Sequence, residues 1–213
     1  KKIKFLSSPF CIDSFDLLRK FNLDFIKIPS GEITNLPLLR HIRKFNNDII
    51  LSTGMSNLNE IKNAVQILKN KNRKIILLHC NTEYPTPIFD INLNAMQALK
   101  KKFKLEVGYS DHSLGTQVPV IAASLGAKVI EKHFTISKKM VGPDHVASLN
   151  PKELISMVKA IRTTEIILGK SKKFVSNSEK KNLLIARKSL FAACDIKKGE
   201  KFSLSNLVCL RPG

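Results

Sequence analysis

Short apolar runs that end in polar clusters recur six times along this chain, and this pattern restricts its fold more than any other feature. Each run is rich in β-branched residues, and a segment with helical spacing follows each cluster. A parallel β/α barrel carries its chemistry at the carboxyl ends of its strands, where the loops meet on one face. The six clusters are therefore candidates for one shared pocket, and the pattern predicts an enzyme. They are Ser7–Phe10, Lys27–Glu32, Ser52–Gly54, His79–Thr82, Ser110–Ser113 and Glu131–His133.

Strands are predicted where the apolar runs are short and nearly continuous, as in strands covered on both faces. These strands are 3–6, 25–28, 49–52, 75–79, 105–109 and 128–132, with helices between them at 12–21, 36–45, 58–69, 93–102 and 116–125. Asn57 and Glu60 resemble a capping box before the third helix. Pro151 begins a long helix that reaches about Leu168. Because a closed barrel has eight strands, we expect an α/β fold with a partial TIM (β/α)8 barrel of about six βα units, and a missing N-terminal piece that carries two more.

The sequence changes character after Gly169. Residues 171–181 are polar and basic, which is typical of a linker, and residues 186–200 predict a strand followed by a tight turn. A further strand is predicted within 204–210. We therefore expect a barrel domain at 1–170, a linker at 171–185, and the beginning of a second small domain at 186–213.

The formal charge of +19 does not define the function. The basic residues are spread along the chain and are densest where helices are predicted to end, which favours a solvated surface. Steering of an anionic substrate is the second reading, and nucleic-acid binding is the least favoured because the charge forms no patch or stripe. No apolar stretch reaches the roughly 18 residues of a membrane span. Four scattered cysteines predict reduced thiols and a cytoplasmic location.

His112 and His133 each end a predicted strand, and the two strands are expected to be neighbours. Two imidazoles at adjacent strand ends could share one metal ion, or they could be a hydrogen-bonded structural pair. Asp111 and Glu131 beside them could support the histidines or act as acid and base.

A second group of residues suits phosphate and carboxylate. Its members offer an ammonium, hydroxyls, an amide and a glycine that permits close backbone approach: Lys27, Ser30, Ser52, Thr53, Gly54, Asn81 and Ser110. Each one alone is more often a helix cap, and only their recurrence on several strands favours binding. The loop Val141–His145 is either a simple turn or a lid that carries Asp144 toward a substrate.

The motifs resemble those of the sialic acid synthase family, the N-acetylneuraminate synthases and their relatives. The matching stretches are Ser8–Phe10, Ser30–Leu38, Ser52–Met55, Tyr84–Pro87, Gly108–Ser113, Glu131–Thr135 and Gly142–His145. The resemblance covers nearly the whole chain, and residues 186–213 are similar to the first half of the family's antifreeze-like (SAF) domain.

The resemblance implies condensation of phosphoenolpyruvate with N-acetylmannosamine or a related acetamido sugar and water, giving a nine-carbon acid and phosphate. It implies a manganese or magnesium ion held by His112 and His133. Phosphoenolpyruvate is expected at Lys27, Ser30, Ser52, Ser110 and, with the choice left open, Asn81 or Thr82. Glu32, Tyr84 and Asp144 are expected to contact the sugar, Phe10 to pack near its N-acetyl group, and Glu131 to handle a proton or orient water. Glu131, Glu32 and Asp144 are thus the expected catalytic residues.

Two other functions are compatible with the same motifs. Legionaminic and pseudaminic acid synthases act on diacetamido sugars, and a non-catalytic sugar-binding fragment is a rival of another class. The resemblance also implies a homodimer, with neither nucleic-acid nor membrane partners. The family's first barrel segment supplies a glutamate and a lysine that this sequence does not contain, so this chain alone is not expected to be active.

Overall fold

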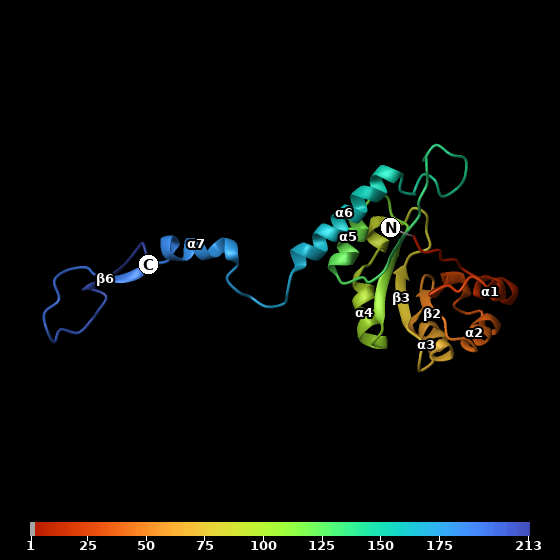
Figure 1. Cartoon of the computed structure of the whole chain (residues 1–213), viewed down its shortest axis with the longest axis horizontal. Helices are drawn as coiled ribbons and strands as arrows, with labels where there is room; N and C mark the ends of the chain where they lie inside the picture. Colours follow the sequence, from red (N-terminus) through yellow and green to blue (C-terminus); the bar gives the residue numbers. More distant parts are fainter. Residues whose placement is uncertain (1–2) are drawn as a thin grey trace. The chain divides into compact units, whose positions relative to one another are not determined.

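The computed structural model describes residues 3–213 (Figure 1). The chain divides into two compact units after Leu168, and each is described by itself. The helices of the first unit are α1 (Ile12–Arg19), α2 (Leu36–Arg43), α3 (Leu58–Leu68), α4 (Asn94–Phe103), α5 (Gln117–Ser124) and α6 (Pro151–Leu168), with short 3-10 turns η1 (Ser30–Glu32) and η2 (Ile88–Asp90). Its strands are β1 (Phe25–Ile28), β2 (Asp48–Ser52), β3 (Ile75–Cys80), β4 (Glu106–Asp111) and β5 (Ile130–Lys132).

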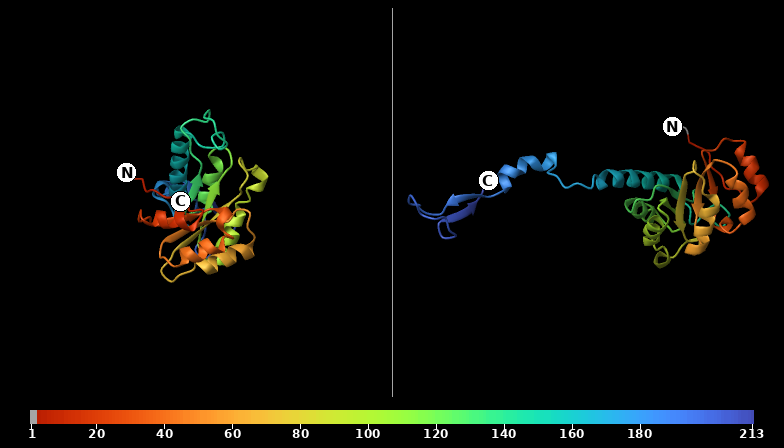
Figure 2. Two further views of the ribbon diagram at one scale, coloured as in Figure 1. Left: turned by 90° about the vertical axis from the view of Figure 1, so that its right-hand side faces the viewer. Right: turned by 90° about the horizontal axis from the view of Figure 1, so that it is seen from below.

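The five strands form one parallel sheet in the order β1-β2-β3-β4-β5, so each strand pairs with the next one along the chain. A helix connects each strand to the next, and these helices lie outside the curled sheet (Figures 1 and 2). Repeated βα units with sequential strand order are the arrangement of a β/α barrel. The prediction of a partial barrel is therefore confirmed, with five strands in place of the expected six.

The strand predicted at residues 3–6 is wrong, because that segment has no regular structure. Ile3 and Phe5 are 97% and 63% exposed, so the apolar run is not part of the core. One backbone bond, from the Lys27 amide to the carbonyl of Ser7, links this end of the chain to β1. An apolar run becomes a strand only when a neighbour pairs with its backbone along a ladder, and composition alone does not supply that neighbour.

The core has two layers, which the alternation of side chains along each strand separates. Residues such as Ile28, Leu51 and Leu77 face the helices and belong to the large outer cluster. Ile50, Ile76 and Leu78 face the inside of the curl and form a smaller inner cluster. Polar side chains that continue the inner set toward the carboxyl ends of the strands consequently reach the inside of the barrel.

Side-chain hydrogen bonds stabilise the start of α3 and the ends of α2 and α3. The predicted capping box before α3 is confirmed, since the Asn57 side chain accepts from the Glu60 amide and Glu60 accepts from the Asn57 amide. Arg73 is 9% exposed, and its guanidinium donates to carbonyls of Ile42, Phe45 and Leu68 at or near the ends of α2 and α3. These bonds satisfy acceptors that a helix terminus leaves open.

The second unit consists of α7 (Asn177–Ala186) and a two-stranded antiparallel sheet of β6 (Ser189–Ala192) and β7 (Leu207–Leu210). Helix α7 occupies much of the segment expected to be a linker, and a capping box between Ser176 and Glu179 begins it. Within residues 169–213 the structure buries only Asn206, whose side-chain amide donates to the Lys201 carbonyl. Across residues 3–213, no helix combines the length and the apolar character needed to cross a lipid bilayer.

Candidate active site

The polar side chains of the inner face converge because the sheet is curled. Lys27 lies on β1 and Glu131 on β5, the two ends of the strand order, yet Lys27 Nζ is 3.4 Å from Glu131 Oε1. In a flat sheet four strand spacings would separate these strands by about 19 Å, which the two side chains together do not span. The contact across the barrel therefore brings the first and last strands of this sheet into one site.

Glu131 also joins Ser110 of the neighbouring strand. The two residues are register partners, and Ser110 Oγ donates to Glu131 Oε1 at 2.6 Å. The Lys27 side chain is 8% exposed, and that of Glu131 is 39% exposed. One carboxylate oxygen thus accepts from a hydroxyl and faces a largely desolvated ammonium, while the other remains accessible for a ligand or a proton.

Hydroxyls from the ends of β1 and β2 line the same inner face. Ser30 Oγ accepts from the Gly54 amide at 3.0 Å and lies 3.2 Å from Cys80 Sγ. Ser52 Oγ is buried and, among residues 3–213, has no hydrogen-bond partner. Since buried polar groups in proteins are nearly always paired, an unpaired hydroxyl on the inner face is available to a water molecule or a ligand that accepts from it.

Gly54 is closely packed, and the side chains of Ser30, Thr82 and Cys80 form a cradle around it. A Cβ at this position would lie 2.8 Å from Ser30 Oγ, 2.8 Å from Thr82 Cγ2 and 3.0 Å from Cys80 Sγ. Thr82 therefore presents its methyl group to Gly54. Sequence reasoning did not single out the Cys80 side chain as part of this cradle, although the alternation along β3 places it on the inner face.

His112 and His133 face each other at the ends of β4 and β5. Their ring centroids are 5.3 Å apart and the rings are nearly perpendicular. Tyr84 stacks on His112 at 4.0 Å and meets His133 edge-on at 5.2 Å. His133 Nδ1 lies 3.5 Å from Asp144 Oδ2, which brings the loop after β5 to the pair.

The surroundings of His112 favour a neutral ring with one free nitrogen. Its Nδ1 faces the carbonyl of Asn81 and Nε2 lies 3.5 Å from Ser110 Oγ. Burial lowers the pKa of His112, and the nearby His133 acts in the same direction. An imidazole that donates through one nitrogen to a carbonyl and keeps the other free is the usual form of a metal ligand.

The donor set fits a divalent ion that two imidazoles hold. Among the described residues, no three His, Cys, Asp or Glu side chains converge closely enough to form a complete cage. The remaining coordination positions would fall to water or substrate.

The other predicted residues lie at the margin or serve local structure. Phe10 is 65% exposed and lies just before the start of α1. Glu32 Oε2 accepts from the side-chain amide of Asn35 at 2.6 Å, and Asn81 Oδ1 accepts from the backbone amide of Glu83 at 2.7 Å. Asn81 and Glu32 each keep further polar atoms that the described contacts do not use.

Asp111, predicted as a supporting or acid–base group, lies on the opposite face of β4. It is fully buried and bonds to Lys132 and Ser113 on the helix side. The acid–base reading of Asp111 is therefore wrong, because neighbouring residues of a strand point to opposite faces. The supporting role of Asp111 stays a prediction, and its side chain pairs with Lys132.

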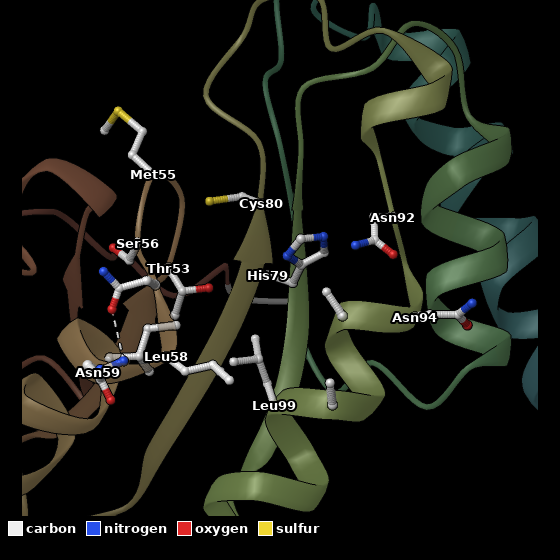
Figure 3. Close-up of a pocket in the computed structure, with 14 residues that line it drawn as sticks. Thr53, Met55, Ser56, Leu58, Asn59, His79, Cys80, Asn92, Asn94 and Leu99 are labelled. Atoms are coloured by element: carbon white, nitrogen blue, oxygen red, sulfur yellow. Dashed lines mark hydrogen bonds between the residues drawn. The ribbon is translucent and has the colours of Figure 1, made fainter.

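A cavity of about 1160 Å³ lies between α3 and α4 (Figure 3). Its lining includes Met55, Leu58, His79, Asn94 and Leu99. His79 Nε2 bonds to the Ile91 carbonyl at 2.8 Å, so this nitrogen is already occupied and does not face a ligand in the cavity. None of the lysine, glutamate or histidine side chains of the inner face lines this cavity, so the chemistry lies elsewhere.

These observations define a parallel β/α-barrel protein with charged and hydroxyl groups gathered at the carboxyl ends of its strands. The chain belongs to the NeuB family, whose sequence model matches residues 1–173. The resemblance inferred from the motifs is thereby confirmed.

Named relatives agree with this family. The chain is 56% identical to the N,N'-diacetyllegionaminic acid synthase of Campylobacter jejuni, over 99% of this chain and 64% of that protein. It is 42% identical to a pseudaminic acid synthase of the same species, over 97% of this chain and 60% of that protein. The crystal structure of an N-acetylneuraminic acid (sialic acid) synthetase from Leptospira borgpetersenii, in complex with citrate, matches with a TM-score of 0.79 and 38% identity, over 85% of this chain and 64% of that one. The chain thus spans less than two thirds of the length of these relatives.

Proposed function

We propose that this site condenses phosphoenolpyruvate with an acetamido sugar and water to give a nine-carbon sugar acid and phosphate. The observation that carries the proposal is the pairing of the buried Lys27 with Glu131 across the curled sheet. A desolvated ammonium attracts an anion strongly, and a carboxylate that can accept a proton stands directly beside it.

Lys27, Ser52 and Ser110 form the anion-binding part of the proposed site. The ammonium of Lys27 pairs with the phosphate or carboxylate of phosphoenolpyruvate, and the two hydroxyls donate to its oxygens. The unpaired, buried Ser52 Oγ supports this assignment because bound substrate supplies the acceptor that the protein lacks. Ser30 and the Asn81 amide complete the rim.

Glu131 is proposed to accept a proton from the water that adds to C2. A bond forms between C3 of the enol and the aldehyde carbon of the sugar as the C2–C3 π bond breaks, and the aldehyde oxygen takes up a proton from solvent water. Water then adds to C2 and gives one proton to the Glu131 carboxylate. The C2–O bond to phosphate breaks as the new C2 hydroxyl becomes a carbonyl, and the hydroxyl proton leaves with the phosphate. Lys27 and Ser110 hold that carboxylate in place before the reaction.

His112 and His133 are proposed to hold a divalent ion, Mn²⁺ or Mg²⁺. When bound, the ion supplies a Lewis acid that polarises the sugar aldehyde. Two nitrogen ligands favour Mn²⁺ over Mg²⁺, because Mg²⁺ takes oxygen ligands almost entirely. Asp144 orients His133 through Nδ1, and the Asn81 carbonyl orients His112.

Tyr84, Asp144 and Glu32 are proposed to bind the sugar. Burial raises the pKa of Tyr84, so its hydroxyl stays protonated and donates. Phe10 is proposed to pack near the N-acetyl group. The 56% identity to a diacetyllegionaminic acid synthase favours a diacetamido sugar over N-acetylmannosamine as the preferred acceptor. Homodimerisation, the antifreeze-like nature of the second unit and the cytoplasmic location stay predictions.

Release of phosphate from phosphoenolpyruvate tests the proposal. It is measured for the chain and for the complete gene product, with N-acetylmannosamine or a diacetamido sugar, with and without Mn²⁺. We expect sugar- and metal-dependent release by the complete product, a loss of at least about 100-fold in His133→Ala, and none from the chain by itself. His41→Ala is the matched control, because His41 pairs with Asp16 on the outer helices.

A non-catalytic sugar-binding protein is the rival function. Sugar binding without phosphate release by the complete product, with every sugar and metal supplied, would favour it. Release with the diacetamido sugar alone keeps the chemistry and assigns the substrate.

A further inference from the structure

A buried ion pair lies directly behind the candidate site, on the opposite face of the same two strand ends. Asp111 follows Ser110 on β4, and Lys132 follows Glu131 on β5. Alternation along a strand turns these two side chains toward the helices, while Ser110 and Glu131 face inward. Asp111 and Lys132 are register partners, so they face each other as Ser110 and Glu131 do.

The pair is enclosed and saturated with hydrogen bonds. The Asp111 side chain is 0% exposed and that of Lys132 is 3% exposed, with 2.6 Å between Lys132 Nζ and Asp111 Oδ2. Asp111 Oδ1 accepts from the Ser113 amide at 3.0 Å and from Ser113 Oγ at 2.7 Å. Lys132 also donates to the carbonyl of Ser113. The pair therefore ties the end of β5 to both β4 and the turn that follows it.

Strand β5 depends on such a tie because its own ladder is short. It contains three residues, and three register pairs join it to β4, the last of them Asp111 with Lys132. It is also the last strand of the described sheet, so a single neighbour holds it in the ladder. Glu131 and His133 stand on either side of Lys132, so any displacement of this strand end moves both.

Stability alone does not account for this arrangement. Replacing a buried ion pair by apolar residues of similar volume is often neutral or stabilising, whereas a charged pair with fixed hydrogen bonds specifies one geometry. We propose that Asp111 and Lys132 are positioning residues that set the distance between His112 and His133. The expected effect on metal binding and turnover rests on the proposed function, whereas the expected effect on the distance between the two histidine rings does not.

The Lys132→Met variant tests the inference through two readouts. In the metal-free chain, NMR cross-relaxation between the ring protons of His112 and His133 reports their contact, whose centroids are 5.3 Å apart. We expect this signal in the parent chain and its loss in the variant. Mn²⁺ affinity, followed by the EPR signal of the free ion, should fall by about 10- to 100-fold, the range for residues that orient metal ligands.

Two control variants separate positioning from general damage. Lys74→Met removes another cation that pairs with β4, since Lys74 Nζ lies 2.6 Å from Glu106 Oε2 at the other end of the strand. Arg73→Met removes a buried cation that lies far from the strand ends of the site, so it destabilises the fold without changing the site. Both should keep the ring contact and the parent affinity for Mn²⁺.

The double variant Asp111→Asn/Lys132→Met guards against misfolding of the single one. It removes both charges, keeps an acceptor for Ser113, and should fold because no uncompensated charge is left buried. A folded double variant with the ring contact intact and a Mn²⁺ affinity within twofold of the parent overturns the inference. If the parent chain binds no Mn²⁺, the metal part of the proposed function fails, and the ring contact alone decides the positioning role.

Discussion

The position of β5 against β4 depends on a glycine. Gly108 lies on β4 with its α-carbon toward the inside of the curl, beside Leu78 of β3 and Val129 just before β5. A Cβ added there would lie 2.7 Å from Leu78 Cδ2 and 3.0 Å from Val129 Cβ, and closer still to the Val129 carbonyl oxygen. That oxygen accepts from the Tyr109 amide at 2.9 Å, so it cannot retreat without loss of a ladder bond.

Gly108→Ala should therefore separate the two strands by about 1 Å, the shift that returns the methyl group to ordinary contact distance. Overpacking of this kind costs about 1–3 kcal/mol, and a weakened backbone bond costs about 1 kcal/mol more. We expect the free energy of unfolding to fall by about 2–4 kcal/mol. The same shift lengthens the 2.6 Å bond between Ser110 and Glu131, so proposed substrate and metal affinity should fall as well.

Equilibrium unfolding in urea measures the change, with circular dichroism as the signal. Gly31→Ala is the matched control, because a Cβ on Gly31 meets no atom within 4 Å, and its stability should stay within about 0.5 kcal/mol of the parent. A loss below about 0.5 kcal/mol in Gly108→Ala would refute the claim that close approach at this glycine sets the spacing of β4 and β5.

Three further outcomes follow from individual buried groups. Ser52→Ala removes an unpaired hydroxyl, so the free energy of unfolding should stay unchanged or rise by up to about 1 kcal/mol. The same variant should bind phosphoenolpyruvate about 10-fold more weakly in titration calorimetry. Equal binding by the variant and the parent would contradict the anion site. Arg73→Met should lower the free energy of unfolding by about 3 kcal/mol in urea titrations, because several buried carbonyls lose their donor. Burial lowers the pKa of His79 below its usual 6.5, so the unfolded chain binds a proton more readily than the folded chain does. The free energy of unfolding should therefore fall as the pH drops below about 6.5. This dependence of stability on pH should be weaker in His79→Gln.

Features that depend on a few neighbouring residues could be read from the sequence. The capping box of Asn57 and Glu60 begins α3 as predicted, and Pro151 begins the long helix α6. Strand β1 has the predicted bounds, and β2 and β3 each extend one residue beyond them. The site motifs also identified the family, because their order and spacing are specific to it.

Which polar residues share the site could be read only in part. Ser110, Asp111 and His112 stand consecutively in one motif, and the alternation of a strand sends Asp111 to the opposite face. That separation was predictable from the period of two, once β4 was known to extend through Asp111. The partner of Asp111 was not predictable, since it required the register of β4 with β5.

The sequence by itself determined the βα repeat, the helix starts, the family and most of the residues at the strand ends. The tertiary structure decided that residues 3–6 form no strand, that Lys27 meets Glu131, and that Asp111 pairs with Lys132. The physical reason is that capping and periodicity are carried by bonds within a few residues. The curl of a sheet and the register of its strands instead arise from packing summed over the whole unit, so contacts between distant residues exist only after it has folded.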